Sequence, residues 1–158
     1  MAALNPQVIG KEMPHGFAGC YARQPDMIVE TRPAGGETPI PFGAPLVYDA
    51  TKPAVVAAGA TFAATNFVGV AGCEIKSALT YLDQQAGQYA PGEPVSVFQR
   101  GSINVRAYGT PALGGTVYVR TAASGTYTTE PVGAFTATNE SGSTVALTNC
   151  QWGGPADA

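Results

Sequence analysis

The chain has 158 residues, the size of a single domain, and a formal net charge of −3. Only 12% of its residues are charged, against roughly 25% in an ordinary soluble domain. Its 8 Lys and Arg residues are scattered singly, so no basic stripe is available to bind phosphates or an anionic membrane, and we expect neither nucleic acid nor a membrane as partner.

The first 26 residues are predicted to form an extended N-terminal arm. Prolines and glycines recur without a hydrophobic period, yet the segment has too many apolar residues for a purely disordered tail. The apolar side chains of this segment that we expect to make contacts, within the domain or with a neighbouring subunit, are Ile9, Met13, Phe17 and Tyr21. They either fold back on their own domain or dock on a neighbouring subunit, and the sequence leaves both alternatives open. The arm lacks a charged stretch followed by an apolar run, so we expect synthesis in a cytoplasm.

After the arm, short β-prone runs alternate with Gly- and Pro-containing turns. The 20 glycines and 13 prolines argue against long helices. The expected strands are MIVETR (27–32), APLVYDA (44–50), FVGVAGCEIK (67–76), TVYVRT (116–121), GAFTATN (133–139) and STVALTN (143–149). The best helix candidate is SALTYLDQQAGQ (77–88), with Ser77 as a possible N-cap and Gly87 at its end.

A β-hairpin is predicted within PGEPVSVFQRGSINVRAYG (91–109). Two alternating runs flank the turn-like residues 100–102, which places Val95 and Val97 on a common apolar strip with Ile103 and Val105.

Short strands at roughly eight- to twelve-residue spacing predict an all-β fold. We expect a small β-barrel or β-sandwich of short antiparallel strands, with the extended arm and at most one short helix. Residues 1–26 are assigned to the arm, 27–152 to the β-rich domain and 153–158 to a flexible tail.

No enzymatic motif is present. A Ser-His-acid or Cys-His site would depend on His15, the single histidine, which lies in the arm far from any rigid element. Pairs of acids for glycosidase chemistry can be drawn from Glu74, Asp83, Glu93 and Glu130, but isolated surface acids are the commoner case. We therefore expect no catalytic residues and no cofactor.

The three cysteines, Cys20, Cys73 and Cys150, are widely spaced and odd in number. No C-x-x-C pair occurs, and a structural zinc site needs four Cys or His ligands, which three widely spaced cysteines and a single histidine would hardly supply. We expect no metal and interpret the cysteines as small buried hydrophobic residues or inert thiols.

Four segments follow one another in a recognisable order: FVGVAG (67–72), YAPGEPVSVFQRGSINVRA (89–107), A-x-G-G-T-V-Y-V-R (112–120) and GAFTA (133–137). In these segments, the first three of which lie in the stretch from Phe67 to Thr128, the chain resembles the structural cement (head decoration) proteins of tailed bacteriophages. The likeness extends over about residues 27–147 and does not clearly include the arm or residues 77–88.

The resemblance implies a homotrimeric β domain at quasi-three-fold positions on the outer surface of the virion, with the major capsid protein and copies of itself as partners. The implied function is that of a non-enzymatic cement protein, which binds the outside of the assembled head lattice and stabilises it by bridging neighbouring capsomers. The alternative is a carbohydrate-binding or adhesive β module of a phage fibre or cell-surface structure. In that case Trp152 and the seven tyrosines could form a sugar-stacking platform.

Overall fold

The computed structural model describes residues 16–73 and 86–156, without the side chains of residues 23–25. Within this part of the chain the protein is all-β, and its single helical element is a 3-10 turn, η1, at Ala64–Asn66. No helix among the described residues is long and apolar enough to cross a membrane.

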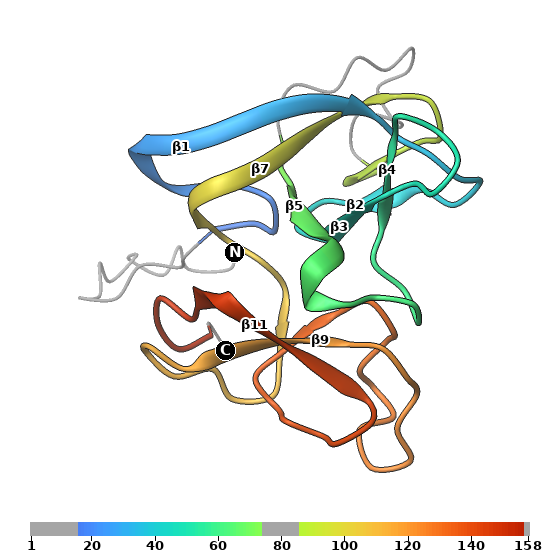
Figure 1. Ribbon diagram of the computed structural model, residues 1–158. Helices are drawn as coiled ribbons and strands as arrows, with labels where there is room; N and C mark the ends of the chain where they lie inside the picture. Colours follow the sequence, from blue (N-terminus) through green and yellow to red (C-terminus); the bar gives the residue numbers. More distant parts are fainter. Residues whose placement is uncertain (1–15, 74–85, 157–158) are drawn as a thin grey trace, which may run out of the picture.

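The largest sheet has five antiparallel strands in the order β1-β7-β5-β3-β4 and forms the upper half of the molecule in Figure 1. Its strands are β1 (Tyr21–Pro33), β3 (Pro45–Tyr48), β4 (Val55–Ala57), β5 (Phe67–Ala71) and β7 (Pro94–Ile103). The longest two, β1 and β7, lie next to each other, and β1 forms one edge.

A second sheet has four strands in the order β11-β9-β10-β8 and lies below the first (Figure 1). Its strands are β8 (Ala107–Tyr108), β9 (Thr116–Arg120), β10 (Phe135–Thr136) and β11 (Thr144–Gln151). A small third sheet pairs β2 (Ile40–Pro41) with β6 (Gln88–Tyr89). None of the sheets closes into a barrel, so the layered alternative of the predicted all-β fold is the one observed.

The central strands of the five-stranded sheet have buried side chains on both faces. Along β7 the side chains alternate between two core clusters. Phe98 belongs to the cluster on the side of the second sheet, together with Val119 and Trp152. Val95 and Val97 belong to a separate cluster, together with Tyr89 of β6. Because successive residues of a strand point to opposite faces, one continuous apolar run supplies both cores. The sheet is therefore the middle layer of the fold.

The hairpin predicted for residues 91–109 is wrong. β7 continues through residues 100–102 to Ile103, and its partner is β1, with Tyr21 opposite Ile103 and Ile28 opposite Arg100. Gly101 has a positive φ of 113°, and a Cβ there would lie 3.0 Å from the ring of Phe98, so this glycine allows an irregularity within the strand where a turn was expected.

The apolar strip that the hairpin would have formed is wrong as well. Val95 and Val97 face the cluster with Tyr89, while Ile103 and Val105 pack against the cluster with Phe98. The irregular residues between them change the side of the sheet toward which the chain points.

The helix predicted for 77–88 falls largely on residues outside those described, and Gln88 belongs to β6. The boundaries of the arm, the domain and the tail stay predictions. β1 begins at Tyr21, inside the segment assigned to the arm.

Candidate interaction surfaces and a buried ion cluster

The four arm residues predicted to make contacts have different surroundings. Ile9 and Met13 lie outside the described residues. The side chain of Phe17 is 83% exposed. The ring of Tyr21 is half-buried and stacks on Phe98, with ring centroids 5.3 Å apart. Phe17 is thus available to a partner, while Tyr21 contacts the core of its own domain.

Phe17 projects from a segment that is hydrogen-bonded to the sheet. The N–H of Gly19 donates to the carbonyl of Asn104 at 2.8 Å, and the N–H of Asn104 donates back to the carbonyl of Cys20 at 2.9 Å. The N–H of Cys73 donates to the carbonyl of Gly19, also at 2.9 Å. A fixed backbone reduces the entropy lost when an exposed aromatic side chain is buried in an interface.

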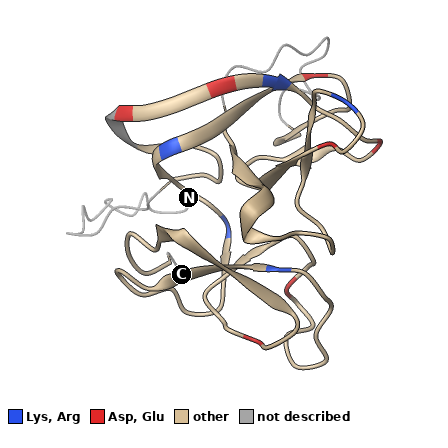
Figure 2. Ribbon diagram, in the orientation of Figure 1, with Lys and Arg blue, Asp and Glu red and all other residues tan. Residues whose placement is uncertain are grey.

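Other large apolar side chains are also exposed, and the charged residues are few and scattered along the described chain (Figure 2). Among residues 16–73 and 86–156, the exposed large hydrophobic residues are Phe17, Ile28, Tyr48, Leu113, Tyr127 and Val132. Single exposed apolar residues are normal, so each by itself does not mark an interface.

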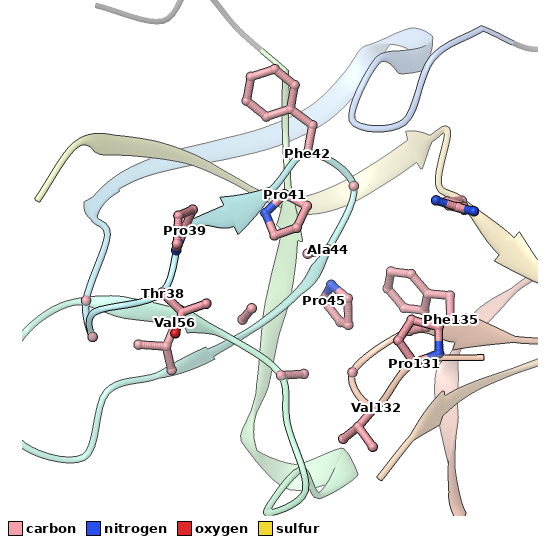
Figure 3. Close-up of a pocket in the computed structure, with 18 of the residues that line it drawn as sticks. Thr38, Pro39, Pro41, Phe42, Ala44, Pro45, Val56, Pro131, Val132 and Phe135 are labelled. Carbon is pink, nitrogen blue, oxygen red and sulfur yellow. The ribbon is translucent and has the colours of Figure 1, made fainter. Parts of the chain in front are cut away.

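An open groove of about 570 Å³ lies between the segment leading into β3, strand β4 and the loop before β10 (Figure 3). Prolines and aliphatic side chains form most of its wall, among them Pro39, Pro41 and Val132. Its charged lining residues are Glu37 and Arg106. The groove therefore presents a mainly apolar surface, and its lining contains a single acid, so it cannot hold a pair of catalytic carboxylates.

A buried ion cluster lies at the end of β9. The side chain of Arg120 is fully buried, and its Nε and Nη2 donate to Oε2 of Glu130 at 3.0 and 2.6 Å. Its Nη1 donates to Oε2 of Glu140 at 2.7 Å, and the hydroxyl of Ser124 donates to the other oxygen of Glu140 at 2.8 Å. The guanidinium also lies over the ring of Tyr127, 5.5 Å from its centroid.

The cluster holds charge in a place from which water is largely excluded. Burial alone would lower the pKa of Arg120, but the hydrogen bonds to Glu140 and Glu130 outweigh it and raise that pKa above its usual value. The same bond from Arg120, together with that from Ser124, lowers the pKa of Glu140. The guanidinium therefore ties the loop at Glu130 and the turn at Glu140 to β9, which is a structural role.

The acids considered for glycosidase chemistry are not arranged as a catalytic pair among the described residues. Glu130 is 5% exposed and bound to Arg120. Glu93 is partly exposed, and its carboxylate accepts a hydrogen bond from the N–H of Ala90 at 2.6 Å. Glu74 and Asp83 lie outside the described residues. Within the described part, no group of three or more His, Cys, Asp or Glu side chains is placed to hold a metal ion.

Trp152, considered for sugar stacking, is 9% exposed and belongs to the core cluster between the two large sheets. Its indole face is therefore not a binding platform. The Arg120 cluster, by contrast, was missed from the sequence. The available signal was a single arginine at the end of an otherwise apolar strand, followed by two turn-flanking glutamates.

The amino-acid sequence matches the profile of a known protein family. The profile of the family described as structural cement protein (E217 gp24/Pam3 gp6) matches residues 5–158, nearly the whole chain. No curated protein matches the sequence. Because the family match includes both large sheets and their connections, the chain belongs to the phage structural cement protein family.

Proposed function

We propose that the protein binds the outside of the assembled phage head and stabilises the lattice by bridging neighbouring capsomers. The observation that carries this proposal is the family match over residues 5–158, which supports a structural, non-enzymatic role in the phage capsid. The proposed partners are the major capsid protein and further copies of the chain in a homotrimer.

The mechanism follows from mass action. A protein that binds only the assembled lattice lowers the free energy of that state, so disassembly must overcome the added interface. A trimer that contacts several capsomers gains effective concentration at each further contact, so individually weak contacts become strong together. Neither step requires a reacting side chain.

The proposed contact residues are Ile9, Met13, Phe17 and Tyr21. Among the described members, Phe17 has the surroundings that an interface residue needs, because it is 83% exposed on a hydrogen-bonded segment. Full burial of a Phe side chain contributes about 1.5–3 kcal/mol per copy before ordering costs. Tyr21 is proposed to support this segment from the domain side through its stacking on Phe98.

The experiment compares capsid occupancy of the parent protein with that of Phe17→Ser. Leu113→Ser is the matched control, because Leu113 is an equally exposed apolar residue, at 80%, in a different turn. Electron cryomicroscopy of heads incubated with each variant should show reduced density for Phe17→Ser and parental density for Leu113→Ser.

Equal occupancy of the two variants would remove the proposed role of Phe17. Absence of the parent protein from intact heads would contradict the cement function itself. Specific binding on a glycan array combined with no binding to heads would favour the adhesive alternative.

A further inference from the structure

Two of the three cysteines, 53 positions apart in the sequence, are brought together by the fold. The Sγ atoms of Cys20 and Cys73 lie 2.9 Å apart and are partly buried. A disulfide has an S–S length of about 2.05 Å, so bond formation requires the sulfurs to approach by roughly 0.9 Å. The sequence, with its odd number of widely spaced cysteines, gave no indication of this pair.

The backbone around both residues fixes this proximity. The N–H of Cys73 donates to the carbonyl of Gly19 at 2.9 Å, and the carbonyl of Cys20 accepts from the N–H of Asn104. On the other side, the buried hydroxyl of Tyr89 donates to the carbonyl of Gly72. Both cysteines are therefore held by hydrogen bonds from neighbouring segments.

The glycines that precede the two cysteines permit the close approach. A Cβ on Gly19, whose φ is +84°, would lie 2.9 Å from the backbone N of Cys73. A Cβ on Gly72 would lie 2.9 Å from the hydroxyl of Tyr21. A larger residue at position 19 would push the two segments apart, and one at position 72 would displace the ring of Tyr21. The tripeptide Ala-Gly-Cys, which occurs at 18–20 and again at 71–73, therefore suits a close contact.

We propose that Cys20 and Cys73 form an intramolecular disulfide when the protein meets an oxidising small-molecule disulfide, such as oxidised glutathione. The thiolate of one cysteine attacks the reagent, forms a mixed disulfide and releases one glutathione thiolate. The thiolate of the other cysteine then attacks the protein sulfur of that mixed disulfide and releases the second glutathione. Two protein thiols are oxidised and one glutathione disulfide is reduced to two thiols, so electrons and atoms balance.

The bond would link Cys20, the residue just before β1, to Cys73, the second residue after the end of β5. It would thus add a covalent link to the hydrogen-bonded segment that carries Phe17. The third thiol, Cys150 in β11, has its pKa raised by burial and serves as an internal comparison.

The test treats the reduced full chain and its Cys150→Ser variant with oxidised glutathione, followed by intact mass, free-thiol titration and peptide mapping without reduction. The variant should lose two hydrogens in mass, retain no free thiol and yield one peptide pair joining residues 20 and 73, while remaining monomeric on a non-reducing gel. The parent should retain one free thiol. Cys20→Ser and Cys73→Ser, each confirmed as folded by circular dichroism, should carry a glutathione adduct in place of the internal bond.

Two persistent thiols in the Cys150→Ser variant, two stable glutathione adducts, a dimer linked through either cysteine, or a bond to Cys150 in the parent would each overturn the proposal. Because the decisive measurement is made on the parent and on Cys150→Ser, it stands even if a serine at position 20 or 73 impairs folding. The outcome is independent of capsid binding, so it does not bear on the proposed cement function.

Discussion

Replacing Arg120 with methionine tests the buried ion cluster. The substitution removes the guanidinium and leaves Glu130, which is 5% exposed, without its partner. Breaking a buried ion pair on one side costs about 3–5 kcal/mol, because a charge stays buried without compensation. Since a domain of this size is stable by roughly 5–15 kcal/mol, Arg120→Met should lose a large part of its free energy of unfolding.

The matched control is Arg100→Met. Arg100 pairs with Asp26 at 3.7 Å, but both side chains are well exposed, at 65% and 78%. An exposed pair of this kind contributes about 0–1 kcal/mol, so its loss should scarcely change stability. The two variants delete the same group and differ in burial.

The double variant Arg120→Met/Glu130→Met separates charge from packing. Replacing both partners by apolar side chains removes the uncompensated charge, and Glu140 is exposed enough, at 26%, to be hydrated. We expect the double variant to recover at least half of the stability lost in Arg120→Met.

The assay is urea unfolding followed by the fluorescence of Trp152, the single tryptophan, which is buried between the two large sheets. The midpoint should fall in Arg120→Met at an unchanged slope. Two results would refute the argument that burial makes the Arg120–Glu130 pair essential for stability. One is a decrease in the free energy of unfolding of Arg120→Met below about 1 kcal/mol. The other is a double variant that is less stable than Arg120→Met.

Three further predictions concern pH, packing and oxidation. Because the pKa of Glu140 is lowered in the folded state, its ionised carboxylate stabilises the fold at pH values above the ordinary carboxyl pKa. This contribution is lost as the pH falls through the folded-state pKa. The difference in free energy of unfolding between the parent and Glu140→Gln should therefore be present at neutral pH and vanish in acid. Gly69→Ala should cost about 1–3 kcal/mol in a urea titration, because its Cβ would lie within the radius of the Phe98 carbonyl, whereas Gly59→Ala, in open space, should stay within about 0.5 kcal/mol. Oxidation of the proposed cysteine pair closes a loop of 53 residues and should raise the free energy of unfolding by about 4 kcal/mol, seen as a Tm increase of roughly 10 °C in a thermal melt and reversed by a reductant.

The strands whose own residues carry the β pattern could be predicted from the sequence. Residues 116–120 and 144–149, for example, lie in β9 and β11 as expected. The alternation of apolar and polar residues within each run is enough to indicate a strand with one buried face, so no information from distant residues is needed.

Strand partners could not be predicted in the same way. The alternating runs around Gly101 suggested a local hairpin, but β7 pairs with β1. Val97, for example, lies opposite Glu30, which is about seventy residues earlier in the chain. A glycine with positive φ allows a turn and an in-strand irregularity equally well, so local chemistry did not distinguish them. Long-range packing decided between them.

The ion cluster and the cysteine pair depend on long-range placement too. Glu130 and Glu140 reach Arg120 from two different loops. Cys20, just before β1, meets Cys73, just after β5, although β7 lies between these two strands in the sheet. Spacing along the chain carries no information about such contacts when the intervening loops have no fixed geometry.

The outer edge of β1 has a consequence for how copies of this protein associate. A long edge strand such as β1, with 13 residues, can pair with a strand of another chain, which favours edge-to-edge aggregation when many copies are made together. Here the pairing with β7 shifts register between Tyr21 and Val29, and Asp26, Glu30 and Arg32 lie along the strand (Figure 2). An edge strand that is irregular and charged is a poor template for pairing with a further strand. We therefore expect the proposed trimer to assemble through side-chain contacts. We also expect the irregular, charged edge of β1 to prevent polymerisation of the unassembled protein.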